Sequence, residues 1–304
     1  IFSYGRSVRK GKVMLQIEND SIKVRISEEG AELQSIFGKN NSIEYLWQGD
    51  PLYWSGKAPN MFPFIARLYK NTYSFDGKEY STRIHGFLPV SKLKVSAQSF
   101  DECTLYLEDS EETLRSYPFK FRLEINYKLE ASKLRVTTEV HNRSEKSMYF
   151  ALGGHPGFNV PLEEGLAFED YELVFSDKCN PQQILFDNDL QVSGEKSPVV
   201  LENGTVLKLH HELFYSDAVV LEGSSGKVFI SSPKGRHGVS VDFSEYPYVG
   251  FWQKYKKDTP YVCIEPWSSL PGRAKTIETL EHMPGRIMLE KGGSYTVSYT
   301  IEVW

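Results

Sequence analysis

The sequence is poor in cysteine, has no excess of positive charge and contains no long apolar segment. Cys103, Cys179 and Cys263 lie far apart, without Cys-x-x-Cys spacing, so neither a disulfide framework nor a structural zinc site is expected. The formal net charge of −5 offers no basic surface for nucleic acid, and no apolar run approaches the ~18 residues that cross a bilayer. We therefore expect a soluble cytoplasmic monomer or homodimer that binds neither nucleic acid nor membrane and holds no metal.

Sequence signatures of several enzyme classes are also absent. The chain has no Gly-x-Ser-x-Gly, no dinucleotide-binding glycine pattern and no phosphate-binding loop. No Pro- or Ser-rich linker and no internal repeat divides it. Residues 1–13 carry several basic side chains and precede Met14, so we interpret them as a leader or a cloning remnant. Residues 14–304 are interpreted as one domain.

Strict alternation of apolar and polar residues is the dominant pattern of the chain. Residues 121–130 alternate in this way, and the alternation resumes over 134–140 after a two-residue break, which predicts a β-hairpin with one solvent-facing side. Similar stretches occur over 14–17, 22–26 and 295–303. Turn-forming Gly, Asn and Asp residues recur between such stretches, and no helical apolar stripe of three turns is present. We expect an all-β fold, a large antiparallel β-sandwich.

Two short segments carry titratable side chains beside residues that fix the backbone. His155 follows two glycines and precedes a proline, a context that suits a side chain facing a ligand. A half-buried histidine in an ordinary turn is the structural alternative. Glu265 follows an apolar run that predicts an interior strand, and the next residue, Pro266, predicts that this strand ends there or reaches a sheet edge. Its structural alternative is an ion pair with an arginine such as Arg273.

An imidazole and a carboxylate are the minimal pair for moving protons near neutral pH, so acid–base chemistry is the leading hypothesis. Two further side chains, Arg67 and His85, lie in proline- and glycine-bounded stretches and could donate to ligand oxygens. A surface arginine and an ordinary loop histidine are the alternatives for these two residues. Aromatic residues make up 13% of the chain, which suits both β-sheets and carbohydrate-stacking surfaces.

Five segments in order, together with these residues, resemble the aldose 1-epimerase (galactose mutarotase-like) superfamily and, more narrowly, its LacX-type mutarotase-related branch. The segments are 60–67, 85–87, 154–158, 249–252 and 263–267. The resemblance spans nearly the whole chain. It implies a large antiparallel β-sandwich with a sugar in an open cleft, and an aldose 1-epimerase reaction on a small-molecule sugar without metal or organic cofactor.

The same resemblance implies roles for individual residues. His155 matches the general acid of the family and Glu265 its general base. Arg67 and His85 match positions that bind sugar hydroxyls or assist at the ring oxygen. An aspartate that holds sugar hydroxyls is best matched by Asp217, with Asp242 as the fallback. The candidates for stacking on the apolar face of the sugar are Trp54, Trp252 and Trp267.

One departure from the family bears on the substrate. Hexose-6-phosphate epimerases of this superfamily usually carry an arginine soon after the His-Gly-Phe segment, whereas Leu88 and Pro89 follow it here. This favours a free hexose, although Arg83, Lys57 or Lys70 could compensate. Two other hypotheses stay open: hexose-6-phosphate epimerisation, and a non-catalytic carbohydrate-binding protein.

Overall fold

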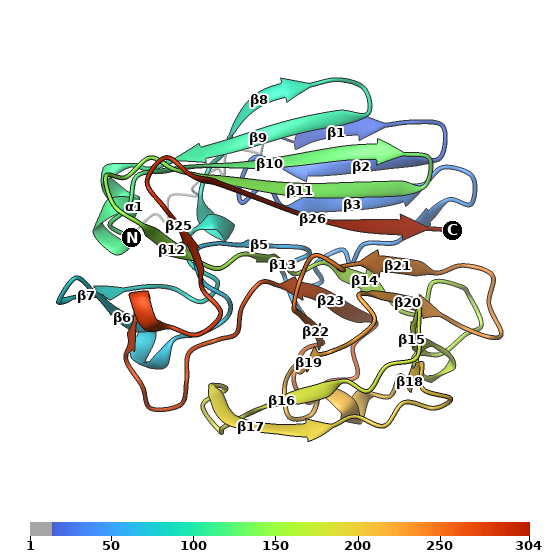
Figure 1. The fold of residues 1–304 in the computed structure, drawn as a ribbon. Helices are drawn as coiled ribbons and strands as arrows, with labels where there is room; N and C mark the ends of the chain where they lie inside the picture. Colours follow the sequence, from blue (N-terminus) through green and yellow to red (C-terminus); the bar gives the residue numbers. More distant parts are fainter. Residues whose placement is uncertain (1–13) are drawn as a thin grey trace, which may run out of the picture.

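The computed structural model describes residues 14–304, which form two large antiparallel sheets and three small ones (Figure 1). In spatial order, the nine-stranded sheet consists of β18 (Val206–Lys208), β15 (Glu172–Phe175), β20 (Lys227–Ser231), β21 (Val239–Asp242), β26 (Ser294–Val303), β11 (Lys133–Asn142), β10 (Phe121–Glu130), β9 (Glu102–Glu108) and β8 (Lys94–Gln98). The eight-stranded sheet consists of β17 (Val192–Pro198), β16 (Gln182–Phe186), β19 (Val219–Glu222), β22 (Tyr248–Trp252), β23 (Tyr261–Trp267), β13 (Gly153–Gly154) and β5 (Asn60–Met61), with β14 (Gly157–Asn159) also paired to β23.

Smaller elements complete the fold. The four-stranded sheet contains β1 (Met14–Glu18), β2 (Ile22–Ser27), β3 (Leu33–Gly38) and β4 (Ile43–Glu44). A three-stranded sheet contains β24 (Glu278–Thr279), β6 (Thr72–Phe75) and β7 (Lys78–Ser81), and a two-stranded one contains β12 (Met148–Phe150) and β25 (Ile287–Leu289). The described residues form one α-helix, α1 (Glu111–Ser116), and five 3₁₀ turns: η1 (Tyr69–Asn71), η2 (Leu88–Val90), η3 (Phe168–Asp170), η4 (His211–Phe214) and η5 (Leu280–His282). None of the helices described is long and apolar enough to cross a membrane.

The alternating stretches of the sequence form the expected strands. Residues 121–130 and 133–142 pair antiparallel as β10 and β11 over their full lengths, from Phe121 opposite Asn142 to Glu130 opposite Lys133. Every second side chain of β10, from Phe121 to Leu129, is buried, because successive strand residues point to opposite faces of a sheet. The prediction of an all-β antiparallel sandwich is confirmed.

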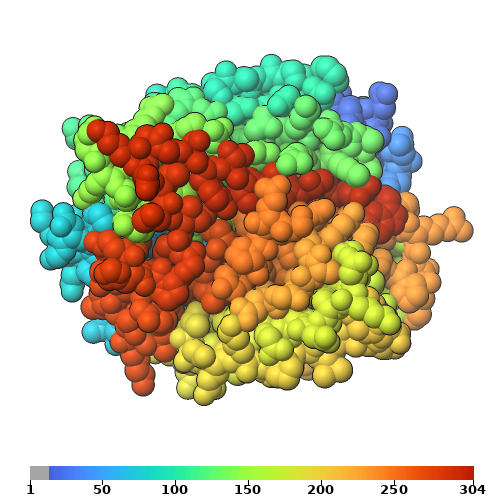
Figure 2. Space-filling model, viewed as in Figure 1, coloured from blue at the N-terminus to red at the C-terminus, as the bar shows by residue number. Residues whose placement is uncertain are grey.

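The largest hydrophobic cluster draws on residues from Ile17 near the start of the described chain to Val303 near its end. The last strand, β26, lies between β11 and β21, so segments that are far apart in the sequence lie side by side (Figure 2). This shared core supports our proposal that residues 14–304 are one domain. The interpretation of residues 1–13 as a leader or cloning remnant lies outside the described residues.

A buried tyrosine joins the nine-stranded sheet to the segment that leads into the site. The hydroxyl of Tyr127 on β10 donates to the main-chain oxygen of Ala31 at 2.5 Å and accepts from the side-chain amide of Asn60 on β5 at 3.0 Å. The Asn60 amide also donates to Gly30 and Ala31. Because these groups are buried, the hydrogen bonds fix where β5 begins relative to the sheet above it.

The sequence predicts that the strand carrying Glu265 ends or reaches a sheet edge at Pro266-Trp267, and β23 does end at Trp267. The strand lies inside its sheet, between β22 and β13, so Pro266 does not mark a sheet edge. On the β13 side, the amides of Ile264 and Ser268 donate to the neighbouring segment, so the donor between them would be that of residue 266. The neighbouring segment is itself interrupted at residues 155–156, between β13 and β14. Because Gly153 pairs with Trp267, the missing amide of Pro266 falls opposite Gly154, directly before this interruption.

Replacement of Tyr127 by Phe is expected to lower the free energy of unfolding by about 1–2 kcal/mol, because two buried hydrogen bonds are lost. The matched control is Tyr106→Phe on β9, where the ring packs on the Arg122 guanidinium and no hydrogen bond of the hydroxyl to a described residue is lost. The control is expected to stay within about 0.5 kcal/mol of wild type. Urea denaturation measures both, and equal effects of the two substitutions would contradict a special role for the Tyr127 hydroxyl.

Candidate active site

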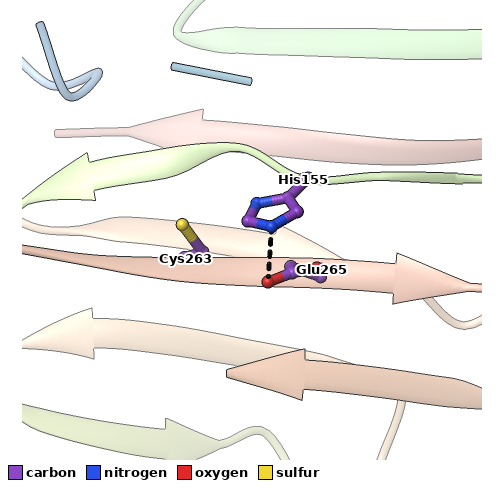
Figure 3. Close-up of side chains that lie close together, drawn as sticks. All are labelled: His155, Cys263 and Glu265. Carbon is purple, nitrogen blue, oxygen red and sulfur yellow. Dashed lines mark ion pairs between the residues drawn. The ribbon is translucent and has the colours of Figure 1, made fainter. Parts of the chain in front are cut away.

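The pairing register places His155 opposite Glu265, because Gly153 pairs with Trp267 and Gly157 pairs with Cys263 on β23. His155 lies in the break between β13 and β14, and Glu265 projects from the middle of β23 (Figure 3). The imidazole Nε2 lies 3.2 Å from the Glu265 Oε1. The two preceding glycines permit this approach: a Cβ on Gly153 would lie 2.4 Å from the oxygen of Pro266, and one on Gly154 would lie 2.7 Å from the hydroxyl of Tyr299. Larger residues at these positions would push His155 away from β23.

Burial dominates the electrostatics of the pair. His155 is 7% exposed and Glu265 is 1% exposed. Burial raises the pKa of Glu265 well above its usual range; the indole N–H of Trp267 opposes this rise, and the charge of Asp217 adds to it. Burial also lowers the pKa of His155 well below its usual value, with a further contribution from His85. Both shifts favour a neutral pair that holds a single proton.

Aromatic rings hold both members of the pair. Trp267 donates its indole N–H to Glu265 Oε2 at 3.1 Å, which leaves Oε1 facing His155. The Trp54 ring lies 5.0 Å from the imidazole, inclined by 32°, and Trp252 meets the imidazole edge-on at 5.4 Å. Trp54 and Trp252 are partly exposed, whereas Trp267 is buried. Of the three stacking candidates, Trp267 is thus placed to orient a carboxylate rather than to cover a sugar.

Asp217 lies at the site and Asp242 does not reach it through any contact of the described residues. Asp217 follows η4 in a left-handed backbone conformation (φ 82°), and its Oδ1 accepts the indole N–H of Trp252 at 2.6 Å. Its other oxygen is left for a further donor. Asp242 ends β21 and instead accepts from the amide and hydroxyl of Ser244. The geometry therefore favours Asp217 over the fallback Asp242 as a side chain beside the acid–base pair.

His85 is a ring neighbour of His155, and Arg67 is close enough to His85 to act on its charge. The rings of His85 and His155 meet edge-on, with centroids 5.5 Å apart. The Nδ1 of His85 accepts the Ala66 amide at 3.2 Å, so in the neutral ring the proton is assigned to Nε2. Burial, followed by the charge of Arg67, lowers the pKa of His85 to about 4, so His85 is a neutral N–H donor near pH 7. The guanidinium of Arg67 makes no hydrogen bond or ion pair with a described residue.

The structural alternative for Glu265, an ion pair with Arg273, does not occur. Arg273 instead pairs with Glu278, whose carboxylate accepts the Arg273 backbone amide, Nε and Nη2 at 2.8–3.0 Å. Glu278 is as buried as Glu265. Two buried glutamates thus differ in their partners: one faces a guanidinium and the other an imidazole and an indole.

The structure adds one residue that the sequence analysis had not placed at the site. Cys263 lies two residues before Glu265 on β23, so both side chains point to the same face (Figure 3). Its thiol sulfur, a His155 nitrogen and a Glu265 oxygen all lie within 4.8 Å of one another. The two-residue spacing of Cys263, Glu265 and Trp267 was visible in the sequence. The nearness of His155 was not, because it comes from a distant segment.

Comparisons with known proteins agree with this architecture. The sequence model of the family described as aldose 1-epimerase matches residues 13–302. Protein LacX (chromosomal) of Lactococcus lactis subsp. lactis is 32% identical over 279 residues, which cover 89% of this chain and 92% of that protein. A galactose mutarotase related enzyme from Lactobacillus acidophilus superposes with a TM-score of 0.92 at 32% identity, covering 96% of this chain and 97% of that one. A galactose mutarotase-like protein from Lactobacillus casei superposes with a TM-score of 0.90 at 31% identity, covering 96% and 100%.

Replacement of Glu265 by Gln is expected to raise the free energy of unfolding at neutral pH. Because the folded state raises the pKa of this carboxyl, wild type loses stability as the pH rises from the ordinary value of 4.5 through the raised pKa. An amide loses no proton over this range and can still pair with His155 and Trp267. The difference in free energy of unfolding between the variant and wild type should therefore grow as the pH rises and vanish in acid. Denaturation at several pH values measures this difference.

Glu278→Gln is the matched control for this experiment. It replaces an equally buried carboxylate whose charge is satisfied by Arg273, so it is expected to lower the free energy of unfolding by about 2 kcal/mol. Opposite signs for the two substitutions are the expected result. A destabilised Glu265→Gln protein at neutral pH would show that burial is not the dominant influence on Glu265.

Proposed function

The chain belongs to the aldose 1-epimerase family, and from that premise we propose that it interconverts the α and β anomers of a free hexose. The observation that carries the proposal is the 3.2 Å contact between the His155 imidazole and the Glu265 carboxyl in a buried setting. The two groups differ in chemistry, hold one proton between them and lie beside partly exposed polar side chains. Anomer exchange requires such a pair, because one proton must leave the anomeric hydroxyl while another reaches the ring oxygen.

In the proposed mechanism, the sugar enters between the two groups and replaces their direct contact. Glu265 takes the proton of the anomeric hydroxyl, and the His155 imidazolium gives its proton to the ring oxygen. The C1–ring oxygen bond breaks and an open aldehyde forms. Rotation about the C1–C2 bond presents the other face of the aldehyde, and reclosure with the two roles reversed gives the other anomer. These proton transfers balance within the pair and need no cofactor.

The pKa shifts support these assignments. Burial makes the Glu265 carboxylate a stronger base and the His155 imidazolium a stronger acid than either would be in water. Proton transfer through the sugar converts the charged pair into the neutral pair. Because burial favours the neutral pair, the charged pair that begins ring opening is the less populated form, and proton transfer through the sugar restores the favoured neutral form.

The surrounding side chains supply complementary hydrogen-bonding groups for a sugar. The neutral His85 offers an N–H and the unpaired Arg67 offers a guanidinium, both donors to sugar oxygens. Asp217 offers a carboxylate oxygen to sugar hydroxyls, and its other oxygen is fixed by Trp252. The exposed parts of Trp54 and Trp252 are suited to the apolar face of a pyranose. We assign substrate binding to these residues on the strength of their placement around His155.

The three cations that could compensate for the missing phosphate-binding arginine are occupied or line a different cavity. Lys57 donates to the Gln34 main-chain oxygen and to the Gln48 side chain, and Lys70 lies over the ring of Tyr69. Arg83 lines a surface cavity of about 570 Å³ whose lining includes neither His155 nor Glu265. These contacts favour a free hexose over a hexose 6-phosphate.

We also propose a reducing, cytoplasmic location and a monomeric or homodimeric state. The three thiols are free in the structure, and two of them, Cys103 and Cys263, are buried, which suits a compartment where thiols stay reduced.

Glu265→Gln and His155→Gln are each expected to slow anomer exchange about 10²- to 10⁴-fold, because each removes one proton-transfer group. Magnetisation exchange between the α and β anomers, measured by NMR against the spontaneous rate, reports the effect. His141→Gln, at a partly exposed histidine of β11 that pairs with Glu139, is the matched control and should keep wild-type exchange. Full activity of either site variant would overturn the assignment. Wild-type exchange at the spontaneous rate, with saturable sugar binding, would instead establish a carbohydrate-binding protein.

A panel of glucose, galactose and glucose 6-phosphate tests the substrate class. We expect the 6-phosphate to lower kcat/KM relative to glucose, since the nearby lysines are already engaged. The same exchange measurement at several substrate concentrations gives kcat/KM for each sugar. A higher kcat/KM for the phosphorylated sugar would replace our proposal with hexose-6-phosphate epimerisation.

A further inference from the structure

The acid–base pair has a third neighbour that proton transfer does not use. Cys263 projects from β23 on the same face as Glu265, and its sulfur lies within 4.8 Å of the ligand atoms of both His155 and Glu265 (Figure 3). All three side chains are buried. A Cβ on Gly157, which is paired with Cys263 on the adjacent strand, would lie 3.3 Å from this sulfur. The glycine therefore leaves the thiol uncrowded on the side of the neighbouring strand.

The three groups have the composition of a metal-ligand set. A thiolate, an imidazole and a carboxylate are ligands that Zn²⁺ and Co²⁺ accept together, whereas Mg²⁺ and Ca²⁺ prefer oxygen alone. Ligands around a tetrahedral ion with bonds of about 2.0–2.3 Å lie roughly 3.5 Å apart. The His155 to Glu265 separation of 3.2 Å is already close to this spacing, and the sulfur needs a shift of at most about 1.3 Å from the 4.8 Å limit.

Charge also favours a divalent cation at this position. A thiolate and a carboxylate carry two negative charges, and a divalent ion neutralises both, so the loaded site has no net charge to bury. Binding releases the thiol proton and the one proton shared by His155 and Glu265. The Nε2 of His155 faces Glu265 and is the nitrogen that a cation between the two groups would meet. The Nδ1 is buried and has no hydrogen-bond partner among the described residues, so no hydrogen bond on that side fixes the ring.

We propose that Cys263, His155 and Glu265 form a site for a divalent, thiolate-preferring cation such as Zn²⁺, which silences the acid–base pair when bound. The metal takes the lone pairs through which His155 and Glu265 exchange protons with the sugar. Sugar and cation therefore compete for the same two groups. Cys263 sets the preference for Zn²⁺ over Mg²⁺, because it adds sulfur to a pair that otherwise offers nitrogen and oxygen.

Co²⁺ is the direct probe, because a cysteine thiolate bound to cobalt gives a near-ultraviolet sulfur-to-metal absorption. Wild-type protein titrated with Co²⁺ under reducing conditions is expected to develop this band, and excess Zn²⁺ should remove it. Cys263→Ser should abolish the band, while the control Cys179→Ser should retain it. The cobalt absorption can be measured without turnover. It therefore tests the metal site independently of the proposed epimerase activity.

Competition provides the second measurement. Cys263→Ser is expected to weaken Zn²⁺ binding by more than about 100-fold, the upper end of what even an outer-shell partner contributes. If anomer exchange is observed, its inhibition by Zn²⁺ is expressed for each protein relative to the rate of that protein without metal. Zn²⁺ should then inhibit wild type and Cys179→Ser far more strongly than Cys263→Ser. Absence of the cobalt band in wild type would overturn the site, and so would its persistence in a folded Cys263→Ser or Cys263→Ala protein.

Discussion

The contact between two buried titratable groups, His155 and Glu265, is the constraint on which the rest of the site depends. Neither group can be charged alone at this depth without a large desolvation cost, so the pair is stable when it holds one proton. The indole of Trp267 fixes one carboxyl oxygen and leaves the other for the imidazole. The cost in folding stability and the proposed reactivity thus have one source, because the burial that disfavours the charged forms also prepares the groups to exchange protons through a sugar.

The backbone around the pair shows how a β-sheet can present such groups. A regular strand would bond its neighbour along its length and would keep side chains at fixed positions on the pleated surface. Here the ladder is interrupted at His155, beside a proline that has no amide to offer, and glycines precede the break where larger residues would collide. The register across this interruption sets His155 opposite Glu265, and Pro266 has no amide that would be left unpaired beside it.

The same face of β23 joins the proposed reaction to the proposed metal site. Residues at every second position of this strand, Cys263, Glu265 and Trp267, supply a sulfur, a carboxyl and an indole N–H. The proposed proton transfer uses the carboxyl, which the indole orients. The proposed metal site uses the sulfur, which an apolar residue would not provide. The proposed catalytic pair and the proposed metal-ligand set therefore share His155 and Glu265.

The sequence by itself determined the fold class and most candidate residues. Apolar–polar alternation requires strands with one buried face, which is why 121–130 and 133–142 pair as expected, and the ordered segments around His155 and Glu265 identify the family. Only the tertiary structure decided that β23 lies inside its sheet, that Arg273 binds Glu278 rather than Glu265, and that Cys263 lies beside His155. These facts depend on which distant segments become neighbours. The local sequence pattern predicts the face of a strand to which a side chain points. The packing of the sheets determines which residues that side chain contacts.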